Sequence, residues 1–190
     1  NSCGTGVAAH LPIIVKPIPV VPICSATVDS ATQKVLIEWQ KPSETYINGY
    51  VIYRETPPLS GNYMNVDTVD NTQFSSYLDL NSNPTIDKVA YKIGCLDSCG
   101  NIASISGAFY HQTIYLYGER QWDGIAKLYW NDYVGVTDPS RYYLILKDSL
   151  GNGPFNDTLA VRYPGNLNYT DISAPSDSAC RYLIELVADV

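Results

Sequence analysis

The chain has few positive charges and few histidines, and both shortages exclude certain classes of function. Only 12 Lys and Arg residues stand against 19 Asp and Glu, which gives a net charge of −7. Phosphate recognition needs clustered Lys and Arg, whereas those here are scattered singly, so nucleic acid is excluded as an expected partner. The two histidines, His10 and His111, lie at no metal-ligand spacing and follow no serine nucleophile turn. We therefore expect no catalytic residue, no metal ligand and no cofactor.

Long apolar runs are also absent. No stretch reaches the roughly 18 apolar residues that a membrane-spanning helix needs. Prolines interrupt the most hydrophobic segment, residues 11–23, at Pro12, Pro17, Pro19 and Pro22. Proline favours extended backbone. We therefore expect no membrane span, and interpret residues 1–22 as the tail of a preceding module followed by a stiff connector.

What the chain does contain is tyrosine in strand-like segments. It has 16 Tyr, 3 Phe and 1 Met, and charged residues make up only 16%. Tyrosine packs its ring on neighbouring strands while its hydroxyl reaches water, which suits half-exposed antiparallel sheets. Period-2 alternation and turn residues predict strands in residues 23–29, 34–41, 49–55, 63–69, 74–79, 89–97, 102–117, 126–133, 141–148, 156–164, 168–171 and 180–190.

The sequence also repeats itself at an offset of about 90 residues. Trp39 matches Trp130, and the segment KVLIEWQKP (Lys34–Pro42) matches AKLYWNDYV (Ala126–Val134). This offset is the length of one small β domain. The prediction is an all-β chain of two consecutive immunoglobulin-like sandwiches, residues 23–114 and 115–190, the second lacking its last strand. The missing strand is expected to be absent, disordered or supplied by another segment.

No flexible linker separates the two predicted sandwiches. The strand-like run around His111–Leu116 passes directly from the first copy into the second. We expect one ribbon to end one sheet and to begin the next, which would make the junction stiff. Loops at one end of a sandwich, such as the turn Pro42–Asn48, are the expected place for partner binding, and alanine substitutions there are expected to leave stability nearly unchanged.

The segments IEWQKPSETYINGYVIYRE and YKIGCLDSCGNIAS resemble a fibronectin type III domain. The resemblance implies that Trp39, Tyr50, Ile52, Tyr91 and Ile93 lie in the core. It covers residues 23–114 well and residues 115–190 less well, because the second copy has Leu146-Lys147 where the first has Tyr53-Arg54.

More narrowly, the segments ATVDSATQKVLIEWQKP, DSCGNIAS and YHQTIYL are similar to tandem modules of large secreted proteins from type IX-secreting gliding bacteria. That likeness implies a non-catalytic stalk or adhesion segment at an extracellular or outer-membrane surface. Its partners would be neighbouring domains of the same longer chain, with protein or glycan at the cell surface as a further candidate. The alternative is a set of accessory modules that hold glycan for, or position, a secreted hydrolase.

Five cysteines in a chain of secreted type suggest disulfides. In a fibronectin-type sandwich the positions of Cys24 and Cys99 fall at the same end, which implies a bond between them. Cys95 alternates with core positions and is predicted to be a buried thiol. Cys3 and Cys180 would then require partners elsewhere.

Two further groups of residues are candidate sites. Asp followed by Ser or Thr resembles the O-glycosylation signal of the same bacterial group, although Asp-Ser and Asp-Thr also simply end strands; the positions are Ser30, Thr68, Ser149, Thr158 and Ser178. Tyr115 and Tyr117 share one face of their strand, with Trp122 just beyond. These aromatics could stack on a sugar ring, but an interdomain contact is the favoured interpretation.

Overall fold

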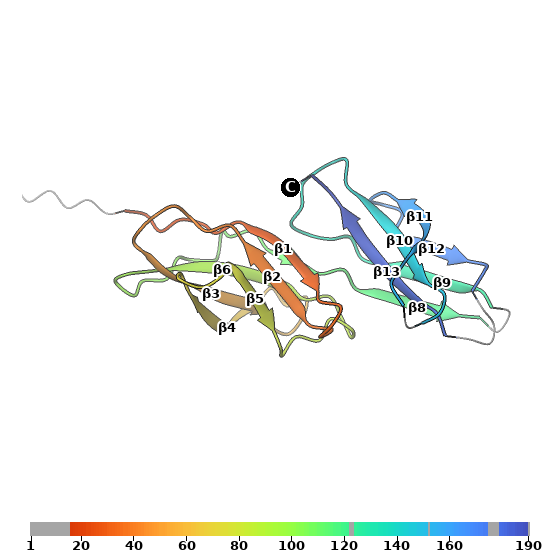
Figure 1. Ribbon diagram of the computed structural model, residues 1–190. Coiled ribbons are helices and arrows are strands. Elements are labelled where there is room, and N and C mark those ends of the chain that lie inside the picture. The colour runs from red at the N-terminus through yellow and green to blue at the C-terminus, as the bar shows by residue number, and fades with distance from the viewer. Residues whose placement is uncertain (1–15, 122–123, 152, 175–178, 190) are drawn as a thin grey trace, which may run out of the picture.

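The computed structural model describes residues 16–121, 124–151, 153–174 and 179–189. This part of the chain forms strands, turns and bends but no helix, and hence no helix that could cross a membrane. The strands form two sandwiches that follow one another along the molecule (Figure 1). The all-β prediction is confirmed.

The first sandwich contains two antiparallel sheets. One has the order β1-β2-β5, with β1 (Ile23–Val28), β2 (Val35–Trp39) and β5 (Ser76–Asp79). The other has the order β4-β3-β6-β7, with β3 (Ile47–Glu55), β4 (Tyr63–Asp70), β6 (Ala90–Asp97) and β7 (His111–Gln112).

The second sandwich repeats this plan. One sheet has the order β12-β9-β8, with β8 (Leu116–Arg120), β9 (Ala126–Trp130) and β12 (Asn168–Asp171). The other has the order β11-β10-β13, with β10 (Tyr142–Asp148), β11 (Asp157–Arg162) and β13 (Arg181–Val187). Within the described residues no strand follows β13, so this sheet has three strands where its counterpart in the first sandwich has four.

Equivalent tryptophans anchor the two interiors. Alternate residues of β2 and of β9 are buried, which places Trp39 and Trp130 inside their sandwiches. Trp39 packs on Tyr50 with ring centroids 5.3 Å apart, and Trp130 packs on Tyr143 with centroids 6.2 Å apart. Both indole Nε1 groups are buried without a hydrogen-bond partner in the structure. The internal repeat is therefore a repeat of packing as well as of sequence.

The core positions implied by the resemblance are correct. Trp39, Tyr50, Ile52, Tyr91 and Ile93 are each at most 2% exposed. Cys95, the predicted buried thiol, is fully buried, and burial raises the pKa of its thiol to about 11.

Two details differ from the sequence prediction. The long strand expected over residues 102–117 is interrupted: beyond an isolated bridge between Leu96 and Ile102, residues 103–110 form no strand. The Ala108 N–H donates to the Ile105 carbonyl and closes a turn there. The connector also packs onto the first sandwich, because Val20 bridges Gly94 and Val21 is buried.

Candidate functional site

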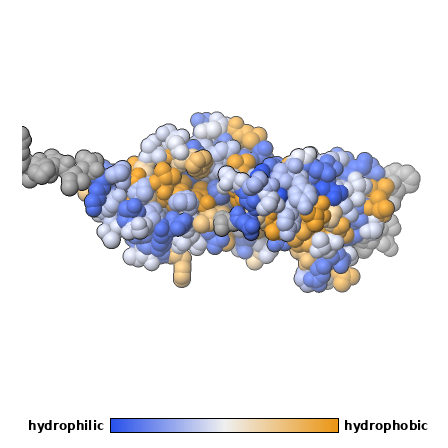
Figure 2. All heavy atoms as spheres, turned by 90° about the horizontal axis from the view of Figure 1, so that it is seen from above, coloured by the Kyte–Doolittle hydropathy of each residue, from blue (hydrophilic) through white to orange (hydrophobic). Residues whose placement is uncertain are grey.

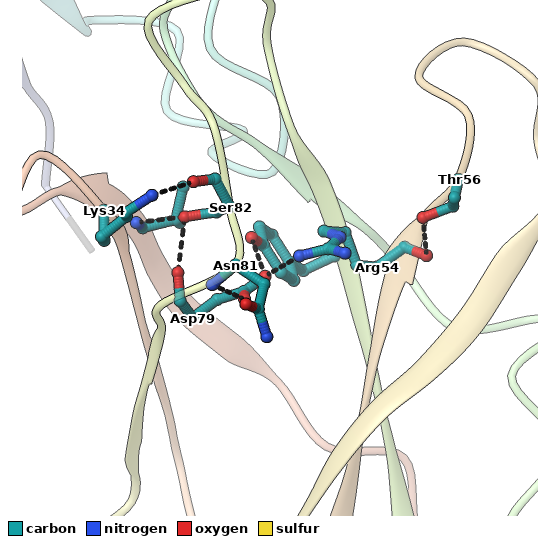
Figure 3. A network of polar contacts seen from close by, with 8 residues as sticks. Lys34, Arg54, Thr56, Asp79, Asn81 and Ser82 are labelled. Atoms are coloured by element: carbon teal, nitrogen blue, oxygen red, sulfur yellow. Dashed lines mark hydrogen bonds and ion pairs between the residues drawn. The ribbon is translucent and has the colours of Figure 1, made fainter.

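The first sandwich contains a buried cluster of polar groups around Asp79 (Figure 3). The Arg54 guanidinium lies 2.7 Å from the Asp79 carboxylate, and the Tyr91 hydroxyl donates to the same oxygen at 2.8 Å. The other carboxylate oxygen accepts the Asn81 N–H at 3.0 Å. Burial raises the pKa of Tyr91, and the neighbouring carboxylate adds to the rise. The cluster ties three strands of two facing sheets together.

The second sandwich builds the same cluster from different residues. Lys147 takes the place of Arg54, with its ammonium 2.7 Å from the Asp171 carboxylate, and the Tyr182 hydroxyl donates to that carboxylate at 2.9 Å. Burial raises the pKa of Asp171, but hydrogen bonds from Lys147 and Ser173 outweigh it and hold the pKa at about 2. The departure of the second copy at Lys147 thus preserves the ion pair. Both aspartates are buried inside their sandwiches, so we assign the two clusters a structural role.

The contact between the sandwiches centres on Tyr133, which follows β9. Its hydroxyl accepts the N–H of Ala26 in β1 at 2.8 Å, across 107 residues of sequence. The same hydroxyl lies 2.9 Å from Nδ1 of His111, and both side chains are buried. The Tyr133 oxygen accepts from Ala26, and its contact with Nδ1 is a hydrogen bond in which the tautomer of His111 sets the donor. Burial lowers the pKa of His111 to about 4 and raises that of Tyr133 to about 12.

The residues that link the sandwiches are bonded on both sides. Thr113 is fully buried; its N–H donates to the Val89 carbonyl and its hydroxyl oxygen accepts the Val89 N–H, each at 3.0 Å. On the other side, Asn131 donates to the Thr113 carbonyl at 3.0 Å and accepts the Tyr115 N–H at 2.7 Å. A further bridge joins Gln112 to Val134. Two linking residues, Gln112 and Thr113, are therefore fixed to both sandwiches.

Gly135 allows the loop to approach this contact closely. It adopts a φ of 120°, and a Cβ built there would lie 2.3 Å from Cγ of His111. Only glycine fits that position. The first copy has Pro42 where the second has Tyr133. The residue that forms the junction is therefore visible in the sequence only as a position where the two copies differ.

Three tyrosines form a partly exposed stack on the second sandwich. Tyr117 pairs with Tyr129 across β8 and β9, with ring centroids 5.3 Å apart, and Tyr115 stacks on Tyr117 at 5.9 Å. Tyr117 is 49% exposed and its ring packs on tyrosines of the second sandwich, so the favoured interdomain role stays a prediction. Tyr115 lies in the linking segment, and Trp122 lies outside the described residues. Tyr129 was missed because its partner across the sheet depends on register.

The structure contradicts the predicted bond between Cys24 and Cys99. Both are exposed free thiols, and the described cysteines form no disulfide. Val20 bridges Gly94 in antiparallel fashion, so the chain runs from this bridge to Cys24 in one direction and to Cys99 in the other. The two thiols therefore do not share an end of the sandwich. Cys180 is a free thiol that donates to the Tyr182 hydroxyl, and Cys3 lies outside the described residues.

Four of the proposed glycosylation positions are exposed: Ser30, Thr68, Ser149 and Thr158. Ser178 lies outside the described residues. The Ser149 hydroxyl donates to Asp157 at 3.0 Å, and the aspartate before Thr68 bonds the Thr68 N–H. Exposure makes modification sterically open, and the local hydrogen bonds equally fit the turn interpretation, so modification stays a prediction.

Carboxylates at strand ends cap the turns that follow. Asp29 accepts from Thr32, Asp70 from Thr72 and Asp97 from Asn101, and these hydrogen bonds lower the pKa of each aspartate. The described residues contain no group of three His, Cys, Asp or Glu side chains arranged to hold a metal ion.

The turn Pro42–Asn48 is less free than expected. Ile47 is only 4% exposed and belongs to the first core, and Tyr46 packs against that core while donating to the Pro17 carbonyl at 2.8 Å. Ser43 and Thr45 are exposed. The exposed residues in the first half of the turn are therefore available for partner contacts. Tyr46 and Ile47, in its second half, pack in or against the core of the first sandwich.

No protein-family model and no curated protein matches the chain. Solved structures do. The central fibronectin-III array of RIM-binding protein is 12% identical, with a TM-score of 0.38, and the match covers 91% of this chain and 60% of that one. The FN1–FN3 domains of chicken CNTN1 are 13% identical, with a TM-score of 0.40 and coverage of 91% and 68%. The chicken interferon gamma receptor alpha chain is 13% identical, with a TM-score of 0.34 and coverage of 92% and 83%.

The strand order decides the fold class. Each sandwich places its first, second and fifth strands in one sheet and its third, fourth and sixth in the other, and in the first sandwich the seventh strand joins the latter. The protein is a tandem of fibronectin type III-like sandwiches. Likeness at these identities and TM-scores says nothing of function, so the function must be argued from the junction and the surfaces.

Proposed function

We propose that this segment is a non-catalytic spacer, a stalk or adhesion segment in which two fibronectin type III-like sandwiches are held at a fixed angle. The observation that carries the proposal is the junction, where Thr113 bonds the first sandwich and accepts from Asn131 of the second. Tyr133 of the second sandwich bonds Ala26 and His111 of the first. A flexible tether would need none of these contacts. A rigid spacer needs them all, because relative motion between domains is the default where an interface is small.

The proposed location is an extracellular or outer-membrane surface. Support comes from the resemblance of the repeated segments to secreted tandem modules. The surface also fits: exposed hydrophobic residues form separate groups among hydrophilic ones (Figure 2), and the net charge of −7 opposes nonspecific association.

The decisive experiment measures the orientation of the two sandwiches in solution. Residual dipolar couplings from each sandwich should fit a single alignment tensor in the unmodified protein. Tyr133→Phe removes the hydroxyl that Ala26 and His111 share, so the tensors should separate while each sandwich stays folded. Tyr163→Phe is the matched control, because Tyr163 is 61% exposed on the second sandwich. Separate tensors in the unmodified protein would reject a fixed-angle spacer.

A second candidate function, glycan binding by accessory modules, is favoured by one observation. The stack of Tyr115, Tyr117 and Tyr129 presents aromatic surface on the same sheet face as Lys127 and Glu119, which pair across β8 and β9. Aromatic rings with polar neighbours can stack on and hydrogen-bond a sugar. A glycan array supports this function if binding is lost in Tyr117→Ala and kept in Tyr163→Ala. An array without binding by the intact protein rejects it.

A further inference from the structure

The loop that follows β9 carries Tyr133 to the junction and is held from inside the second sandwich. The Tyr133 N–H donates to the hydroxyl of Tyr143 at 2.9 Å, and the same hydroxyl donates its proton to the Asp132 carboxylate. Tyr143 lies in β10 and is fully buried, with its ring packed against Trp130. One core hydroxyl therefore fixes two consecutive residues of the loop.

The groups around the Tyr143 hydroxyl set the direction of these hydrogen bonds. A carboxylate can only accept, so the single phenol proton points to Asp132 and a lone pair remains for the Tyr133 N–H. The Arg141 guanidinium lies 3.0 Å from the other Asp132 oxygen and holds the carboxylate in place. Burial and the hydrogen bond to Asp132 raise the pKa of Tyr143 to about 12, so the phenol keeps its proton at neutral pH.

The same short segment makes contacts of the junction. The Asn131 amide donates to the Asp132 carbonyl at 2.8 Å and to the Thr113 carbonyl of the linking segment at 3.0 Å. Tyr133 bonds Ala26 of the first sandwich through its side chain, while its main chain is bonded inward. A displacement of this main chain would therefore move the Tyr133 hydroxyl away from its partners.

The first sandwich uses the equivalent core tyrosine differently. Tyr50 is the counterpart of Tyr143, but its hydroxyl donates at 2.7 Å to the side chain of Asn71, in the turn after β4. Lys41 stands where the second copy has Asp132, and its ammonium donates to the Asn71 carbonyl at 2.6 Å. The core tyrosine thus holds a different turn in each copy.

The bond to the loop after β9 is specific to the second copy. The first copy has Pro42 at the position of Tyr133, and proline has no N–H that a tyrosine hydroxyl could accept. The first sandwich nevertheless has the same packing of tryptophan on tyrosine in its core. The fold therefore does not require this bond, and its presence coincides with the loop that docks.

We propose that Tyr143 is a positioning residue of the junction, which holds the main chain of Tyr133 where the Tyr133 hydroxyl reaches the first sandwich. Asp132 assists by accepting the Tyr143 proton. The inference rests on the proposed fixed-angle spacer and extends it, because the angle is then set by the core of the second sandwich as well as by the contact itself.

Tyr143→Phe tests this role, because it removes the hydroxyl and keeps the ring. The Tyr133 amide should exchange with solvent about tenfold faster, as expected for one lost buried hydrogen bond. The dipolar couplings of the two sandwiches should no longer fit one tensor, although both sandwiches stay folded. Tyr50→Phe is the matched control, since it removes the equivalent hydroxyl from the first core and should leave both readouts unchanged.

A double variant separates positioning from a general effect on stability. Because Tyr143 acts through Tyr133, adding Tyr143→Phe to Tyr133→Phe should separate the tensors no further. Asp132→Ala changes a side chain that is 38% exposed, so it leaves the core intact, and it should also separate the tensors. This variant tests the role even if Tyr143→Phe does not fold.

The proposal is overturned if folded Tyr143→Phe keeps a common tensor, or if Tyr50→Phe separates the tensors equally. A common tensor in Asp132→Ala overturns it as well. Separate tensors in the unmodified protein would reject the fixed-angle spacer and this inference with it. A common tensor in both the unmodified protein and Tyr143→Phe would reject the positioning role alone.

Discussion

At the scale of single residues, the two copies show which features the fold requires and which it can exchange. Arg54 and Lys147 differ in shape, yet each pairs with a buried aspartate that also accepts a tyrosine hydroxyl. The aspartate of the Tyr-x-Asp motif is fixed in both copies because it also caps the following turn through Asn81 or Ser173. Arg54 and Lys147 share only one contact, the ion pair with the aspartate. Either side chain can make that contact, so this position differs between the copies.

The ion pair of the second sandwich can be tested by removing one partner. Lys147→Met leaves the buried Asp171 carboxylate unpaired and should destabilise the second sandwich by about 3 kcal/mol. Lys147→Arg restores the pairing of the first copy and should cost less than about 1 kcal/mol. Urea unfolding followed by the amide signals of β10 gives both values. Equal stability of Lys147→Met and the unmodified protein would contradict the structural role of the pair.

Gly135 gives a test that separates strain from collision. Gly135→Ala introduces both a strained φ and a Cβ that meets the His111 ring, so the junction should loosen while both sandwiches remain folded. Gly165→Ala is the matched control, since its φ of 92° imposes comparable strain but no atom lies within 4 Å of the added Cβ. Dipolar couplings report the angle and circular dichroism reports folding. A common tensor retained in Gly135→Ala would show that the glycine is dispensable.

At the scale of elements, alternation predicted the strands well because one face of each sheet is buried. β2 alternates inward Val35, Ile37 and Trp39 with outward residues, and a pattern of period two is visible without any partner. The interruption after Ile102 was not predicted, because Ala, Ser and Ile fit a strand equally well. Nor could the role of Tyr133 be predicted, since its partner Ala26 lies 107 residues away and the contact belongs to a pair of domains.

The turn Pro42–Asn48 illustrates the same limit and can be tested directly. Ile47→Ala removes a core side chain and should destabilise the first sandwich by about 3 kcal/mol. Ser43→Ala changes an exposed residue and should stay within about 0.5 kcal/mol of the unmodified protein. Denaturant unfolding monitored at β3 amides measures both. Indistinguishable values would mean that the whole turn is as free as its sequence suggests.

At the scale of the whole molecule, the junction should respond to pH through His111. Burial lowers the pKa of its imidazole to about 4, whereas an exposed imidazole titrates near 6.5. When the two sandwiches separate and His111 becomes exposed, its imidazole therefore binds a proton more readily. The docking free energy is fully present above pH 6.5 and is lost progressively as the pH falls toward 4.

The angle between the sandwiches should accordingly become variable between pH 6.5 and pH 4 while both stay folded. Asp171, with its pKa held at about 2, loses its charge only at lower pH. Unfolding of the second sandwich through loss of its ion pair is therefore expected in a separate, lower pH range. In His111→Gln, docking should become insensitive to pH across the upper window, and His10 serves as an internal control because both proteins contain it. Scattering profiles recorded from pH 7 to pH 4 measure the change. A profile that shifts equally in both proteins would assign the acid response to groups outside the junction.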